Sequence, residues 1–233
     1  FEKKYGIAKS KFNAKDFMAS TSPEAKKIIA QYAAKAIDIP RPKKDTEKLT
    51  GVVKDIVYDN IQLPAIFVGY KFPEQTHPDI YALDMLNEVL SGGSSSRMNK
   101  TIVEKKEMAV QAFSFNYGLE DAGVGIIAAI AANGIELDAI QAEFDAQIDL
   151  MKKEMISQEE FEKVRNKIEN DFVSSNASIA GVAENLADNH VYYGSADRVN
   201  KEMAEYMKVT REDISSFCIY QIDILGVFSF LRI

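Results

Sequence analysis

The order of hydrophobic periods after residue 50 restricts the fold more than any other feature of the sequence. The stretch "GVVKDIVYDNIQLPAIFVGYKF", residues 51–72, holds two β-rich runs around the turn residues Asp59 and Asn60. The next stretch, 76–90, changes to a helical period, and its apolar stripe consists of Ile80, Leu83, Leu86 and Leu90. The sequence therefore predicts two strands followed by an amphipathic helix.

A second pair of strands and a longer run of helices follow. The segments "AVQAFSFNY" (109–117) and "VGIIAAIAA" (124–132) predict a β-hairpin with a loop of about six residues. The second of these strands is almost wholly apolar, so we expect it in the centre of the sheet. After it, apolar residues recur at spacings of three and four: Leu137, Ile140, Phe144, Ile148, Met151 and Met155.

Local end signals divide the rest of the chain into further helices. The stretch "SQEE", 157–160, predicts a capping box at the start of a helix. Another helix is expected to end at Gly194, and Thr210 is expected to cap the next one. Strands in pairs followed by runs of helices predict an α+β fold, with an antiparallel or mixed sheet and helices packed on one face.

Residues 1–49 and 50–233 are predicted to be separate parts of the chain. In the first part, Thr21 and Glu24 match a capping box, so we expect a helical segment there. It is followed by a linker, "DIPRPKKDTEK", which is rich in proline and charge. The apolar end of the second part, "FCIYQIDILGVFSFLRI", is either a buried final strand or a non-native sequence.

Composition excludes several classes of protein. The net charge of the 233 residues is -7, and basic and acidic residues are mixed throughout. Nucleic-acid binding needs clustered basic residues, so we do not expect it. The sequence contains no stretch long and apolar enough to predict a membrane span. Its single cysteine, Cys218, cannot form an internal disulfide.

The ionisable residues form no recognisable catalytic motif. The two histidines, His77 and His190, lie far apart, and neither an H-x-x-E-H nor an H-E-x-x-H motif is present. We therefore expect no zinc site made by this chain alone, with His77 at a cap or the surface and His190 half-buried. There is no G-x-S-x-G motif, and Cys218 lies in an apolar run, which favours a buried, inert thiol.

One corner between two predicted helices invites comparison with a phosphate loop: "LSGGSSSRMNKTIVEKKEMA", residues 90–109. A P-loop requires glycine directly before the Lys-Thr pair and follows a strand, and this stretch departs from both rules. Gly92 and Gly93 instead suit a helix end, Ser94–Ser96 suit the start of the next helix, and Arg97 can reach a nearby carboxylate or helix C-terminus. A weak anion site at the helix start is the alternative to this structural interpretation.

The corner and its surroundings resemble the non-catalytic domain of the pitrilysin/insulinase (inverzincin) family of zinc metallopeptidases, and bacterial members in particular. The residues that match the family's "GGxSSRL" corner are Gly92, Gly93, Ser95, Ser96, Arg97 and Met98. Four other stretches resemble family elements in the same order: "IQLPAIFVGYKFP", "DIYALDMLNEVL", "ISQEEFEKVRNKIENDF" and "VTREDI". The resemblance covers residues 51 to 214.

This resemblance implies the second, non-catalytic domain of a zinc peptidase that is built from repeated α+β domains. Family members carry zinc on an H-x-x-E-H motif in another domain, so zinc is expected on a partner domain and this chain is expected to be inactive alone. The implied partners are a catalytic domain or subunit of the same family and a peptide substrate, with a homodimer as a further option. Both the periplasm and the cytoplasm of a bacterium remain open.

The resemblance also implies where substrate would be contacted. In the family an Arg and a Tyr near the hairpin contact substrate, whereas the hairpin here offers Asn116 and Tyr117 and no Arg. With Arg97 of the corner, these are the candidate substrate-binding residues, and structural packing is the alternative for each. Two other functions compete with the peptidase domain: a structural or assembly subunit, as in respiratory-complex core proteins, and a peptide-binding protein without protease activity.

Overall fold

The computed structural model describes residue 23 and residues 51–220 and 227–232. The chain divides into two compact units, Phe1–Asp45 and Thr46–Ile233, and the fold described below belongs to the second. The helix expected after Thr21 and the linker 38–48 lie outside the described residues, except that Pro23 is helical.

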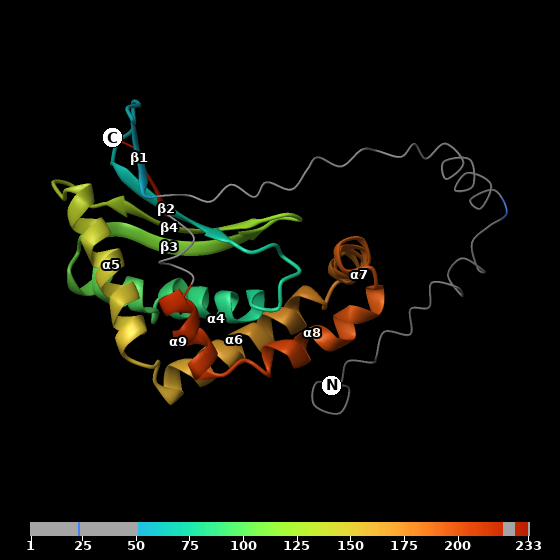
Figure 1. Cartoon of the computed structure of the whole chain (residues 1–233). Helices are drawn as coiled ribbons and strands as arrows, with labels where there is room; N and C mark the ends of the chain where they lie inside the picture. The colour runs from blue at the N-terminus through green and yellow to red at the C-terminus, as the bar shows by residue number, and fades with distance from the viewer. Residues whose placement is uncertain (1–22, 24–50, 221–226, 233) are drawn as a thin grey trace. The chain divides into compact units, whose positions relative to one another are not determined.

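Five strands form one mixed sheet in the order β1-β5-β2-β4-β3 (Figure 1). Their bounds are β1 Val53–Val57, β2 Ala65–Phe72, β3 Ala109–Gly118, β4 Gly123–Ala131 and β5 Val227–Arg232. β1 pairs with β5 in parallel, and all other neighbours are antiparallel. The mixed sheet and the interior position of β4 confirm the sequence predictions.

β1 and β2 do not form a hairpin, although they follow one another in the sequence. β5 lies between them and pairs with both strands. The expectation that successive strands pair is therefore wrong here and correct for β3 and β4. The β3–β4 loop is also shorter than expected, because Gly118, the last residue of β3, pairs with Gly123, the first residue of β4.

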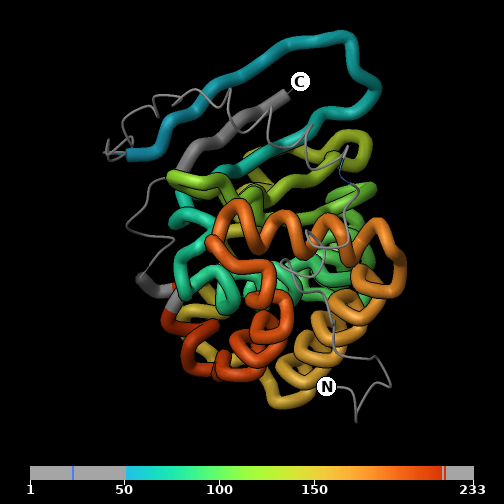
Figure 2. Tube along the Cα trace, turned by 90° about the vertical axis from the view of Figure 1, so that its right-hand side faces the viewer, coloured from blue at the N-terminus to red at the C-terminus, as the bar shows by residue number. Residues whose placement is uncertain are grey.

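The helices lie on one side of the sheet, and a second view turned by 90° shows the same arrangement (Figures 1 and 2). Their bounds are α4 Ile80–Ser91, the π-helix η1 Asn99–Lys105, α5 Leu137–Lys153, α6 Gln158–Ser175, α7 Ile179–Tyr193, the 3-10 helix η2 Ala196–Arg198, α8 Val199–Tyr206 and α9 Arg211–Tyr220. Among the described residues, none of these helices has the length and apolarity that a membrane span requires. The fold is thus the predicted α+β layer.

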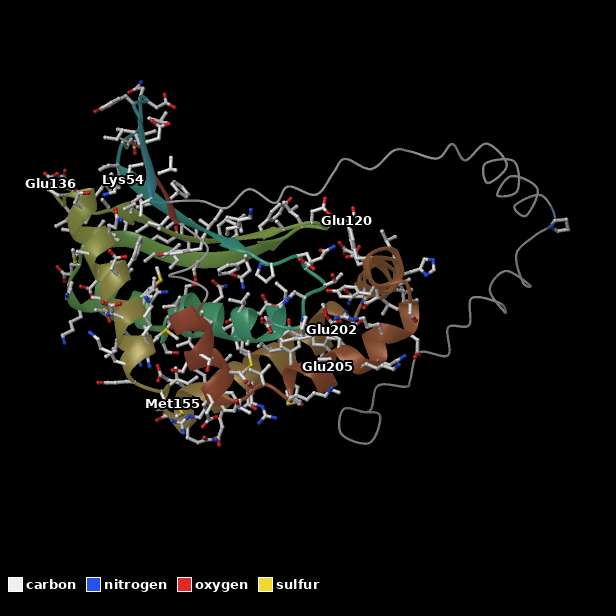
Figure 3. The ribbon with its side chains drawn as sticks, viewed as in Figure 1. Lys54, Glu120, Glu136, Met155, Glu202 and Glu205 are labelled. Atoms are coloured by element: carbon white, nitrogen blue, oxygen red, sulfur yellow. The ribbon has the colours of Figure 1, made fainter. Side chains whose placement is uncertain are left out.

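The core fills the space between the inner face of the sheet and the helices. β2 contributes alternate residues, Ile66, Val68, Tyr70 and Phe72, as the period of a strand requires. The α5 stripe is buried from Leu137 to Met151, whereas Met155 is 45% exposed. The expectation for Met155 is wrong because α5 ends at Lys153, so Met155 lies in the turn between α5 and α6 (Figure 3).

Most helix ends follow the local sequence signals. Ser157 and Glu160 form the predicted capping box at the start of α6. Gly194 ends α7 in the left-handed conformation, with a φ of 75°. The side chain of Thr210 accepts a hydrogen bond from the N–H of Asp213, as expected for a cap.

Candidate functional site

The glycine- and serine-rich corner is tied to α6. Arg97 donates from Nε and Nη2 to the two carboxylate oxygens of Glu160, at 2.9 and 3.0 Å. The hydrogen bonds from Arg97 lower the pKa of Glu160 to about 2. Lys163 also donates to the hydroxyl of Ser95 at 3.0 Å. Arg97 thus reaches a carboxylate, as the sequence suggested, and the contact joins segments that are far apart in the chain.

Three serines were expected to start the helix after this corner, and helical residues do begin directly after the third, at Arg97 and Met98 ahead of η1, with the Ser96 carbonyl accepting from the N–H of Lys100 at 3.0 Å. Met98 precedes η1 and makes no side-chain cap. The hydroxyl of Ser96 accepts from the side-chain amide of Asn99 at 3.1 Å. Gly93, in contrast, has a φ of 87°, which glycine adopts without strain, as predicted for the helix end.

Asn116 points to the helix side of the sheet. Its Nδ2 donates to Oδ1 of Asp84 on α4 at 2.9 Å. The hydroxyl of Tyr206, at the end of α8, donates to Oδ2 of the same carboxyl at 2.8 Å. Burial raises the pKa of Asp84 above its usual range, because the charged form loses water that no nearby cation replaces in these contacts.

The same helix also covers the backbone of β3 at Ser114. The N–H of Ser114 donates to Oγ of Ser91 at 2.9 Å, and its carbonyl accepts from Ser91 Oγ and Asn87 Nδ2 at 3.1 and 3.3 Å. β3 is the last strand of the described sheet, so these groups would otherwise be open to another strand. Helix α4 therefore closes this edge of the sheet at Ser114.

Tyr117 lies on the other side of the sheet, where no described helix packs. The register places rows of residues across three strands, with Phe67 opposite Ala128 and Ala128 opposite Phe113. We call the apolar part of this surface the exposed sheet face; it comprises Phe67, Phe113, Phe115, Tyr117, Val124 and Ile126. Tyr117 is 58% exposed and Phe115 39% exposed. An uncovered apolar surface of this kind is typical of a contact site.

Sequence reasoning missed the exposed sheet face as a unit. The alternation of Phe113, Phe115 and Tyr117 is visible in the sequence. However, an apolar face of a strand is ordinarily assigned to the core, and here the core takes the opposite face, with Ala112 buried. The three candidate residues consequently do not meet: Arg97 pairs with α6, Asn116 faces α4, and Tyr117 lies on the exposed sheet face.

A second polar cluster, centred on Arg198 of η2, holds the end of the hairpin. The guanidinium lies 3.4 Å from the centre of the Tyr193 ring, donates to Oδ1 of Asn189 at 3.0 Å and also donates to the hydroxyl of Tyr81. Tyr193 donates to the carbonyl of Gln75 at 2.7 Å. The N–H of Gln75 donates in turn to the carbonyl of Leu119, beyond the end of β3, at 3.0 Å.

The residues that could ligate a metal are dispersed. Over residues 51–220 and 227–232, no three His, Cys, Asp or Glu side chains are grouped to hold an ion. His77 Nδ1 accepts from the N–H of Asp79 at 3.3 Å, as a cap would. His190 is exposed on α7, not half-buried as expected. Cys218 is fully buried, and burial raises its pKa to about 12. In the described part of the chain, these side chains do not fit a zinc site of the H-x-x-E-H kind.

Comparisons with known proteins place this arrangement in context. The family model described as the peptidase M16 inactive domain matches residues 16–168. The zinc protease PqqE of Helicobacter pylori is 35% identical over 151 residues, which cover 64% of this chain and 34% of that protein. The crystal structure of a protease from Helicobacter pylori superimposes with a TM-score of 0.80 and 24% identity, covering 91% of this chain and 53% of the other.

The chain spans only about a third to a half of the length of these relatives. A chain of complex III2 from Candida albicans has the same fold, with a TM-score of 0.66, 12% identity, and coverage of 77% of this chain and 45% of that one. Since the family model extends over most of the described domain and the relatives are bacterial zinc proteases of the pitrilysin family, the chain belongs to the peptidase M16 family, as an inactive domain.

Proposed function

We propose that this chain is a non-catalytic domain of a zinc-dependent peptidase, and that its exposed sheet face forms part of the wall that contacts the peptide substrate. The observation that carries the proposal is the group of exposed aromatic side chains, Phe67, Phe115 and Tyr117, on the side of the sheet away from the helices. The metal and the bond-breaking chemistry belong to another domain, because the described side chains do not fit a zinc site.

The geometry favours contact through side chains over the addition of a peptide strand at β3. Ser91 and Asn87 already occupy the outward N–H and carbonyl of Ser114, so a peptide would have to displace α4 before it could pair there. Among the described residues, the exposed sheet face has no such obstacle. Aromatic rings there can pack against the side chains of an unfolded peptide and thereby remove apolar surface from water.

Peptide binding by the isolated chain tests the proposal. The probe is a fluorescein-labelled extended peptide with leucine and phenylalanine at alternate positions, and a matched peptide with serine at those positions serves as its control. We expect Tyr117→Ala to weaken binding of the first peptide about tenfold, corresponding to about 1.4 kcal/mol for the loss of one packed ring. Fluorescence anisotropy measures the affinity.

A matched control variant separates the exposed sheet face from the rest of the surface. Leu150→Ser removes an apolar side chain that is 38% exposed on α5, in the helix layer. It is expected to leave the affinity unchanged. Equal affinities for wild type and Tyr117→Ala, or equal losses in both variants, would exclude the exposed sheet face as the contact and favour a structural or assembly role without peptide binding.

A further inference from the structure

The end of the hairpin that carries Tyr117 is held from the opposite side of the sheet. Asn116, the preceding residue, donates to Asp84 at 2.9 Å. Beyond Tyr117, the carbonyl of Leu119 accepts from the N–H of Gln75 at 3.0 Å. Adjacent residues of a strand point to opposite faces. These two contacts therefore fix the backbone on either side of Tyr117 without touching the Tyr117 side chain. The placement of Tyr117 thus depends on contacts made on the helix side.

The side chain of Asp84 links three elements through hydrogen bonds. Its carboxyl belongs to α4 and accepts from Asn116 on β3 and from the Tyr206 hydroxyl of α8, at 2.9 and 2.8 Å. Both donors are neutral. An ionised carboxyl in this position has lost water and gained no cation in exchange.

The charged and titratable groups around Asp84 come from α4, α7, η2 and α8, and Lys167 of α6 binds the neighbouring Glu88 at 3.2 Å. Glu88 lies one turn further along α4 and raises the pKa of Asp84. The groups on the helices packed against this site are Tyr81 on α4, Tyr193 on α7, Arg198 on η2, and Glu202 and Tyr206 on α8. Figure 3 labels Glu202, which lies on the helix side, and Glu120, at the free end of the hairpin. The guanidinium of Arg198 donates to Tyr81 and Asn189 and stacks on the ring of Tyr193.

From this geometry we propose that Asp84 is a positioning residue whose ionisation decides how firmly the end of β3 bearing Tyr117 is held. The proposal rests on the proposed function of the exposed sheet face and adds a means of regulating it. When Asp84 is protonated, Oδ1 still accepts from Asn116, and the new O–H can donate to the Tyr206 oxygen in the same heavy-atom arrangement. When it is ionised, the same arrangement keeps a charge away from water.

The direction of the effect follows from linkage between protonation and opening. Burial raises the pKa of Asp84 in the closed arrangement above its value in an open, hydrated one. The closed arrangement is therefore favoured as the pH falls, and opening is favoured as the pH rises through the raised pKa. Each unit by which the pKa is raised multiplies the ratio of open to closed molecules at high pH by about ten.

A single tryptophan reports on this change, because the chain contains no Trp. In a Tyr117→Trp variant, acrylamide quenching of the tryptophan is expected to increase with pH in one titration, with its midpoint above the usual range of an aspartate. Adding Asp84→Asn should abolish the titration and keep quenching at its low-pH value at all pH values. The asparagine can accept from Asn116 and donate to Tyr206, which is the hydrogen-bonding pattern of the protonated acid.

Three further variants identify the titrating group. Glu202→Gln should leave the midpoint nearly in place, and Phe67→Trp, on β2 of the same face, should give quenching that does not vary with pH. Tyr206→Phe removes a donor to the ionised carboxyl and should move the midpoint upward, which gives a result even if Asp84→Asn does not fold. A titration that survives Asp84→Asn, disappears in Glu202→Gln, or keeps its midpoint in Tyr206→Phe would overturn the assignment.

These measurements contain no peptide, so they are independent of the proposed function. Quenching that does not vary with pH, together with intact peptide binding, would refute the positioning role alone. A titrating tryptophan in a chain that binds no peptide would refute the proposed contact surface and leave the coupling between Asp84 and the strand standing.

Discussion

Arg97 and Glu160, which are far apart in the sequence, form a two-point ion pair that also completes a helix cap. The guanidinium binds both carboxylate oxygens at 2.9 and 3.0 Å, and the same carboxylate accepts from the N–H of Ser157 at 3.1 Å. One side chain thus caps α6 and binds the corner after α4. This explains why a corner rich in glycine and serine contains an arginine: Arg97 fixes the corner that follows α4 to the first turn of α6.

Replacement of Glu160 is expected to change how stability depends on pH. The pKa of Glu160 is lowered from 4.5 to about 2 in the folded chain. Its contribution to the free energy of unfolding is therefore complete above pH 4.5 and is lost as the pH falls towards about 2. We expect Glu160→Gln to lower the free energy of unfolding at neutral pH by about 1 to 2 kcal/mol, after allowance for solvent screening. Urea unfolding across that pH range should show the difference from wild type shrinking in acid.

Glu162→Gln, on the exposed side of the same helix, is the matched control for Glu160→Gln. Glu162 accepts only from Gln158 in the described contacts, so its replacement should have little effect at any pH. A constant difference between wild type and Glu160→Gln over the whole range would contradict the assigned role.

Arg198 is expected to be irreplaceable by lysine. The guanidinium stacks on Tyr193 at 3.4 Å and donates to two other side chains, which an ammonium group cannot do from one position. We expect Arg198→Lys to destabilise the fold by about 2 kcal/mol and to speed amide exchange at the end of the hairpin. Lys201→Ala, at an exposed site on α8, is the control and should leave both measurements unchanged.

Gly125 on β4 makes room for the ring of Phe72. A Cβ at this position would overlap the ring carbons of Phe72, which is buried on the inner face. We expect Gly125→Ala to cost about 1 to 3 kcal/mol of stability, and a second change, Phe72→Leu, to offset part of that cost. A double-mutant cycle by urea unfolding measures the coupling.

Gly51→Ala provides the comparison for Gly125→Ala, because nothing lies within 4 Å of its added Cβ. It should change stability by only a few tenths of a kcal/mol. Additive effects of Gly125→Ala and Phe72→Leu would show that the overlap is relieved in some other way.

Metal removal is expected to leave the chain unchanged. The two histidines do not form a common metal site. The Nδ1 atom of His77 accepts a hydrogen bond from the N–H of Asp79, and His190 is exposed on α7. Dialysis against a chelator should leave the thermal unfolding midpoint in place, and elemental analysis should find no stoichiometric zinc. Zinc bound in a one-to-one ratio and lost on replacement of His77 or His190 would refute this.

Much of the fold could be predicted from the sequence, because local signals determine local structure. The capping box at Ser157, the glycine that ends α7 and the stripe from Leu137 to Met151 involve residues within a few turns of one another. Hydrogen-bond geometry and side-chain period at that range do not depend on the rest of the molecule. The fold class followed from the order of these elements.

Sequence alone determined the elements and their order, and the tertiary structure decided which of their faces meet. The insertion of β5 between β1 and β2 pairs segments from the two ends of the domain, and no local period encodes such a pairing. The polar stripe Asp84, Asn87 and Ser91 is, in the sequence, indistinguishable from a solvated helix face, yet it binds Ser114 and Asn116. The sequence made both Asn116 and Tyr117 candidates, and tertiary packing separated them: the helices lie on one side of β3, so Asn116 binds Asp84 and Tyr117 is exposed on the other side.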